Sequence, residues 1–230
     1  MRCLMKGDLK VKNREINSVL NLYNVNPNYY HTYCHYLDCM NKFERNINSL
    51  NFEMTKLLQY PFDLRWDIDF FNEVFLWHDS VYIPGNSNNE ELSAKEYKRF
   101  VTKVKGERFV NFAVYEAILS TKIGYDIEGL TETTKSSKEF KMFCKIIHDI
   151  DWLGFANYEE CVKNERKIIN EALAFTNLTT REVKEKRLEF YESIVDKDLY
   201  LTETFGCYNE IARENIQKRI KKLKENLKCF

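Results

Sequence analysis

Apolar residues recur at helical spacing along most of the chain and predict a series of helices. The clearest case is the stretch 67–79, which is apolar on nearly all sides and therefore predicts a buried helix. The first segment, 1–26, has one apolar face, on which we expect Ile16, Leu20 and Leu22 to be the anchors. The other stretches that we expect to be helical are 29–50, 53–59, 89–105, 108–122, 138–152, 158–174, 179–195 and 207–230.

Turn-forming residues mark the breaks between these segments. Residues 24–28 and 83–88 combine Asn with Pro or Gly, and both stretches predict loops. Pro61 ends the segment before it, because the residue that precedes a proline avoids the α conformation. The polar stretch 124–137 predicts a mobile loop.

The chain is poor in residues that break helices. It has 7 Gly and 3 Pro in 230 residues, which favours helices over a turn-rich β-sandwich. This length suits one domain with a sizeable core, and no repeat or change of composition divides it. We therefore expect an all-α, single-domain helical bundle over 1–230. Its N-terminal helix would lie within 1–26, and a C-terminal helix within 205–230 would pack on it.

Charge and cysteine content narrow the class of protein. The 35 basic and 35 acidic residues balance, so the chain lacks the basic field that duplex DNA binding needs. The seven cysteines show no CxxC spacing, and no stretch is apolar enough for a leader peptide or a membrane span. We expect a cytoplasmic protein with reduced thiols that binds neither a membrane nor duplex DNA.

The histidines carry the candidate chemistry. The chain has only 4, and each stands close in sequence to an acid or to another histidine. His78 and Asp79 form a doublet at the end of the buried helix, and His35 lies on an earlier helix. Imidazole and carboxylate together suit borderline to hard divalent ions. His35, His78, Asp79 and a later aspartate are therefore candidate ligands of one divalent ion.

Motifs around these residues resemble those of the HD superfamily of metal-dependent phosphohydrolases. The chain is most similar to a branch with YHxxxH, HDxVY and NEExSA motifs, which stand here at 30–35, 78–82 and 89–94. Further similar segments cover nearly the whole chain and lie at 117–122, 149–154, 199–202 and 210–215. The ordered set at these spacings is far more specific than the His-Asp doublet alone.

The resemblance implies an HD-type helical bundle whose metal ligands are His35, His78, Asp79 and Asp151. Asp149 is the close alternative to Asp151, and whichever of the two does not ligate would orient a ligand histidine or lie among the substrate-binding residues. The metal is a divalent ion, for which Mn, Co, Mg, Fe, Ni and Zn are all candidates.

The resemblance also implies roles beyond the metal. Asp79, Glu90 and Glu91 would be catalytic, with a glutamate that orients water or transfers a proton. For one of the two glutamates, a charge interaction at a helix start is the alternative. His31 would contact a phosphate or a second metal, and Lys122 would either neutralise a phosphate oxygen or be solvated.

The chain differs from the family pattern at residue 123, where isoleucine stands in place of a histidine. This difference argues against a second metal ion and against a histidine-assisted leaving-group step.

The resulting hypothesis is an enzyme that hydrolyses a phosphate ester of a small nucleotide by metal-activated water. One alternative is a catalytically weak or inactive HD-fold protein that binds or senses a nucleotide. Another is a phosphodiesterase that acts on cyclic nucleotides or oligonucleotides. The expected partner is a small phosphorylated substrate, and a homodimer is one option for the oligomeric state.

Overall fold

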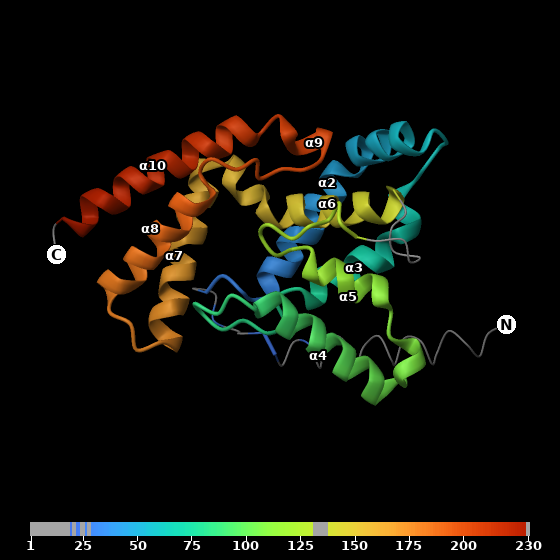
Figure 1. Ribbon diagram of the computed structural model, residues 1–230, viewed down its shortest axis with the longest axis horizontal. Helices are drawn as coiled ribbons and strands as arrows, with labels where there is room; N and C mark the ends of the chain where they lie inside the picture. The colour runs from blue at the N-terminus through green and yellow to red at the C-terminus, as the bar shows by residue number, and fades with distance from the viewer. Residues whose placement is uncertain (1–18, 20–21, 24–25, 27–28, 131–137, 229–230) are drawn as a thin grey trace.

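The computed structural model describes residues 19, 22–23, 26, 29–130 and 138–228, and helices follow one another through most of them (Figure 1). The expected all-α fold is confirmed, because the described residues form helices, short 3₁₀ turns and loops but no β-strand. None of these helices combines the length and apolar character that a membrane span requires. The five cysteines in the described part of the chain are all free thiols.

The central helix, α2, spans Tyr33–Leu58 and buries one apolar stripe. Its buried residues recur every three or four positions, which is the period of a helix face turned toward a core. The stripe ends where Gln59 adopts a left-handed conformation (φ 62°) and donates its N–H to the carbonyl of Thr55. The apolar members of the stripe are Cys39, Phe43, Ile47, Leu50 and Met54.

The predicted buried helix corresponds to α3, Ile68–Trp77, which follows a 3₁₀ turn at Leu64–Asp67. The Asp63 side chain caps that turn by accepting the N–H of Arg65. Phe71, Val74, Phe75 and Trp77 are fully buried, as expected for a segment that is apolar on nearly all sides. This helix therefore ends inside the protein.

Three further helices complete the half of the core around α3. They are α4 (Asn89–Val104), α5 (Phe112–Leu119) and α6 (Lys138–Trp152). Helix α6 packs on α2, and α5 packs on both α3 and α4. Phe71 stands at the centre of an aromatic cluster, with its ring centroid 4.4 Å from that of Phe43 and 5.1 Å from that of Phe143.

The C-terminal helices form the other flank of the molecule. These are α7 (Tyr158–Phe175), α8 (Thr180–Ile194) and α10 (Asn209–Leu227). A capping box starts α8, in which Thr179 and Glu182 satisfy each other's backbone N–H groups. In Figure 1, α2 and α6 cross the middle, with α3 to α5 on one side and α7, α8 and α10 on the other.

Several predicted boundaries differ from the structure. The stretches 29–50 and 53–59 are one continuous helix, α2, and the predicted break between them is wrong. The predicted helix 108–122 is shorter, because a 3₁₀ turn at Glu107–Phe109 precedes α5. The expected C-terminal helix 207–230 corresponds to α10, and a short helix that was not predicted, α9 (Glu203–Gly206), precedes it. Most of the stretch 1–26, and residues 131–137, lie outside the described part of the chain.

Candidate metal centre and adjoining cavity

His35 enters the site from the buried stripe of α2. It stands one turn before Cys39 on the same face, so the helix that forms the core also delivers this imidazole inward. Its side chain is 3% exposed, and its Nε2 atom lies 2.8 Å from Oδ1 of Asp151. The core of the bundle thereby fixes this ring against α6.

His78 and Asp79 enter the site from the end of α3. The backbone N–H of His78 still donates to the carbonyl of Val74, which keeps the residue in helical geometry. Its Nδ1 lies 2.9 Å from the carbonyl oxygen of Phe75. A carbonyl only accepts a hydrogen bond, so Nδ1 carries the hydrogen, and Nε2 is the atom that can coordinate a metal.

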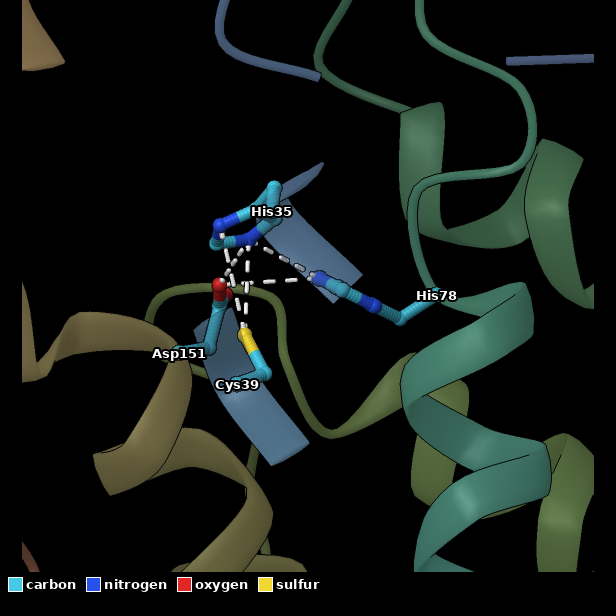
Figure 2. Close-up of side chains that lie close together, drawn as sticks. All are labelled: His35, Cys39, His78 and Asp151. Carbon is cyan, nitrogen blue, oxygen red and sulfur yellow. Dashed lines mark hydrogen bonds and ion pairs between the residues drawn. The ribbon is translucent and has the colours of Figure 1, made fainter. Parts of the chain in front are cut away.

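Four side chains from three helices converge on one point. The two Nε2 atoms of His35 and His78 lie 3.3 Å apart. Oδ2 of Asp79 lies 3.1 Å from Nε2 of His78 and 3.5 Å from that of His35. Oδ1 of Asp151 lies 3.5 Å from Nε2 of His78. Figure 2 shows His35, His78 and Asp151 directed toward one another.

These separations fit a shared cation. Donor atoms around one first-row ion, at bond lengths of about 2.0–2.2 Å, lie roughly 3–3.5 Å from one another. Two imidazoles and two carboxylates also form a donor set that divalent transition metals accept. The described residues can therefore hold a divalent ion, and the predicted ligands His35, His78, Asp79 and Asp151 are the ones brought together.

The imidazoles and carboxylates of the cluster lie close enough to shift one another's pKa. Burial acts to lower the pKa of His78, but the charge of Asp79 and hydrogen bonds to Asp151 and Asp79 outweigh it and raise the pKa well above its usual value. Burial acts in the opposite sense on Asp151, yet the hydrogen bonds of His35 and His78 hold its pKa well below the usual range. The carboxylates are thus ionised and ready to bind a cation.

Cys39 is an additional donor that the motifs did not indicate. One ligand atom from each of His35, Cys39, His78 and Asp151 fits within a mutual distance of 4.8 Å. The sulfur lies 3.7 Å from Nε2 of His35, beneath the ring in Figure 2. Burial raises the pKa of the thiol, and Asp151 raises it further. The only signal in the sequence is its spacing of four residues from His35.

Asp149 lies outside this cluster. Its carboxylate is fully buried and accepts the backbone N–H groups of Leu201 and Thr202 and the hydroxyl of Thr202, at 2.7–2.8 Å. Between the two alternatives left open by the sequence, Asp151 is the one that faces the histidines. Asp149 instead anchors the segment that leads into α9. His148 is also buried, and its ring stacks on Trp152.

The two predicted catalytic glutamates have different environments. Glu91 pairs with Lys122, whose Nζ lies 2.7 Å from Oε1. Glu90 instead lines the cavity next to the cluster, and burial raises its pKa. Both glutamates stand in the first turn of α4, but Glu91 is engaged by Lys122, and Glu90 is the one that lines the cavity.

His31 is held in place by a partner that the motifs did not indicate. Its Nδ1 lies 2.6 Å from Oε2 of Glu171, a buried residue of α7. Its ring stacks on Tyr82 with centroids 3.3 Å apart. Both contacts join segments distant in sequence, so helical periodicity could not reveal them. They fix His31 at the wall of the cavity.

A cavity of about 500 Å³ opens next to the cluster. Asp79 and Asp151 line it, with side chains 16% and 17% exposed, whereas His35 and His78 stand behind them. A cation at the convergence point would therefore be reached from the cavity through its carboxylate side. His31, Glu90 and Lys122 line the same cavity.

Comparisons with protein-family models, curated proteins and solved structures find no match for this chain.

Proposed function

We propose that the protein is a metal-dependent phosphohydrolase of the HD type that acts on a small phosphate ester. The observation that carries this proposal is the convergence of His35, His78, Asp79 and Asp151 on one point at the wall of a cavity. The ordered YHxxxH, HDxVY and NEExSA motifs support the same class of enzyme. Small nucleotides are the first substrates to test.

A divalent ion in this cluster would supply a Lewis acid that polarises a phosphoryl oxygen and lowers the pKa of water toward neutrality. The protein would supply the surrounding groups. Lys122 lines the cavity and can bind a phosphate oxygen, while Glu91 keeps its ammonium oriented. His31, whose Nδ1 donates to Glu171, can in its imidazolium form also donate from Nε2 to another phosphate oxygen. Preorganised donors of this kind stabilise charge that develops in the transition state.

Glu90 is the group best suited to move a proton. It lines the cavity together with Asp79, and its pKa is raised by burial and also by the charge of Asp79. A carboxylate whose pKa shifts toward neutrality can accept a proton from water and return it to a leaving group near pH 7. We therefore assign Glu90 as the general acid and base and Glu91 as a residue that positions Lys122.

Hydrolysis of a panel of substrates tests this proposal, followed by release of inorganic phosphate or pyrophosphate from the nucleotides and the monoester and by release of the alcohol or the nucleoside monophosphate from the diesters. The panel contains nucleoside mono-, di- and triphosphates, a cyclic nucleotide, an aryl phosphate monoester and an aryl phosphate diester, each assayed with Mn, Co, Mg, Fe, Ni and Zn. We expect Asp151→Asn and His78→Ala to lower turnover by at least on the order of a hundredfold. Asp196→Asn, an exposed aspartate outside the cavity, is the matched control.

The possible outcomes separate the candidate functions. Turnover of the diesters alone would identify a phosphodiesterase. Absence of turnover with every metal, in protein shown by elemental analysis to hold the ion, contradicts the proposal. Nucleotide binding that persists without turnover would then identify a sensor.

A further inference from the structure

The cavity has two chemically different parts. One part is the metal cluster with Glu90, His31 and Lys122 beside it. The other part is lined by residues of α7 and α8 and of the loop between them, and most of these side chains are apolar. Its aliphatic lining residues are Ile168, Ile169, Ala172, Leu178 and Val183.

Two cationic residues of α8, Lys186 and Arg187, also line this largely apolar part, and of these Lys186 is exposed and Arg187 half-buried. The guanidinium of Arg187 lies over the rings of Phe190 and Tyr191 at 4.5 and 4.4 Å. One guanidinium nitrogen, Nη2, donates to the Tyr191 hydroxyl at 3.2 Å. The Nε–H is buried without an acceptor, and no carboxylate of the described residues lies within ion-pair distance. A buried guanidinium N–H without an acceptor is costly, and an anion in the cavity would supply the acceptor.

The other cationic side chains in buried surroundings do have partners. Arg219 is held by Glu165 through two hydrogen bonds of 3.0 and 2.5 Å. Lys42 lies 2.7 Å from Asp38 and 2.5 Å from Glu160. Arg187, which is half-buried, has no such carboxylate partner among the described residues and lines the cavity. Trp152, which also lines the cavity, has a buried indole N–H without an acceptor.

Arg187 and the metal end share one cavity. Arg187, Asp79 and Asp151 all line it, and so does Tyr82, whose ring stacks on His31. A ligand that fills this cavity therefore meets both Arg187 and the metal end.

On the basis of the proposed phosphohydrolase function, we infer that the substrate carries a second anionic group, which Arg187 binds. The reacting phosphate would lie at the metal cluster, and a largely apolar linking group would lie against the aliphatic residues of α7 and α8. The second anion is a phosphate or a carboxylate, both of which match the guanidinium fork. Arg187 thereby selects substrates with a second anionic group over phosphate esters of neutral alcohols.

Phosphonates test this inference independently of turnover, because their carbon–phosphorus bond is not hydrolysed in a phosphate-ester reaction. Binding of three probes to the metal-loaded protein is measured by calorimetry. The probes are pentylphosphonate, its analogue with a second phosphonate at the far end of the chain, and its analogue with a carboxylate there. We expect one of the two probes that carry a second anionic group to bind on the order of tenfold to a hundredfold more tightly than pentylphosphonate.

Variants assign that preference to Arg187. We expect Arg187→Met to remove the preference and to leave the affinity for pentylphosphonate unchanged. Arg166→Met, the same change at an exposed arginine of α7 outside the cavity, should keep the preference for a second anionic group. If Arg187→Met does not fold, Arg187→Lys replaces it and should retain only part of the preference, because the bidentate fork is lost.

The results also distinguish this inference from the proposed function. Equal affinities for all three probes, no binding of any probe, or a preference that survives in Arg187→Met overturns the inference. A preference that depends on Arg187, in a protein without phosphatase turnover, would support the anion site and contradict only the hydrolase. Of the two probes that carry a second anionic group, the one that binds more tightly identifies this group as phosphate or carboxylate.

Discussion

His78 is held in one orientation by the hydrogen bond from its Nδ1 to the carbonyl of Phe75. This bond leaves Nε2 facing His35, Asp79 and Asp151, where either a proton or a metal ion can bind. The proton and the ion compete for one lone pair, because a histidine ligand must be deprotonated at its coordinating nitrogen. Metal affinity is therefore coupled to the pKa of this residue.

We predict that metal affinity rises with pH. When no cation is bound, the pKa of His78 is raised well above its usual value, because Asp79 and Asp151 outweigh burial. The stabilisation from the protonated ring is complete below the unfolded pKa of about 6.5 and is lost as pH rises through the raised folded pKa. Affinity should then increase by up to about tenfold per pH unit in that window for each proton displaced.

Calorimetry in buffers of different ionisation enthalpy measures both the affinity and the proton release. An affinity that stays constant across the window, with no protons released, would contradict the prediction.

A second prediction concerns Cys39 as a ligand. Its sulfur lies within reach of the cluster, and thiolate prefers softer metals than carboxylate does. We expect Cys39→Ser to weaken Zn or Co binding by on the order of tenfold or more and to affect Mn binding less. The cobalt-loaded protein should also lose its sulfur-to-metal absorption band. Cys144→Ser, at a buried cysteine elsewhere in the core, is the control. An equal loss for Mn and Zn would speak against sulfur ligation.

The sequence predicted the four ligand residues that converge, since each belongs to a motif with a fixed local spacing. It did not indicate Cys39, Glu171 or Arg187. Glu171 and Arg187 act through contacts between α7, α8 and segments far away in the chain, and local spacing does not encode such contacts. The choice between Asp149 and Asp151 also needed the structure, because both stand in the same turn of α6 and only their packing differs.

At the scale of helices, the predicted boundaries match the structure where the apolar periodicity and the helix-breaking residues indicate the same end. The prediction 138–152 matches α6 because its apolar stripe is continuous. The predicted break after Leu50 was wrong because no Gly or Pro stands there. Asn51, a residue that often favours turns, instead uses its side chain to accept the N–H of Leu64 and to donate to Asp63. A tertiary contact thus overrides a local preference.

Asp149 of α6 holds the segment that leads into α9, and this contact gives a prediction at the scale of helices. Asp149→Ala would leave the donors of Leu201 and Thr202 without their acceptor in the core. Unsatisfied buried donors cost about 1–3 kcal/mol each before relaxation, so we expect a loss of roughly 2–4 kcal/mol in the free energy of unfolding. Chemical denaturation followed by circular dichroism measures this change.

The neighbouring aspartate provides the contrast. Asp151→Asn should lose the metal, whereas folded Asp149→Ala should keep one ion per chain. Elemental analysis of both variants checks this. Loss of the ion from folded Asp149→Ala would mean that the anchor and the metal site are not separate.

At the scale of the whole molecule, the candidate metal cluster joins three elements that also pack together in the core. Its candidate ligands come from α2, the end of α3 and the end of α6. Further polar contacts connect α2 and the segment before it to the other flank, through the Lys42–Glu160 pair and the His31–Glu171 pair. Because these elements pack into one core, we expect a cation bound at the cluster to stabilise the entire bundle.

We therefore predict that the metal raises the melting temperature of the whole protein. An ion that binds only the folded state adds about 2.7 kcal/mol at a free concentration of 100 times its dissociation constant. For a chain of this size, each kcal/mol shifts the melting temperature by roughly 2–4 °C, so a chelator should lower it by about 5–10 °C.

Differential scanning calorimetry of the metal-loaded and chelated forms measures the shift, and Asp196→Asn should show it in full. Asp151→Asn should melt at the same temperature with and without the chelator, because its ligand set is incomplete. A shift of equal size in Asp151→Asn would show that the stabilising ion binds elsewhere. A single cooperative transition in the wild type, moved as a whole by the ion, would indicate that α2, α3 and α6 unfold together with the C-terminal helices.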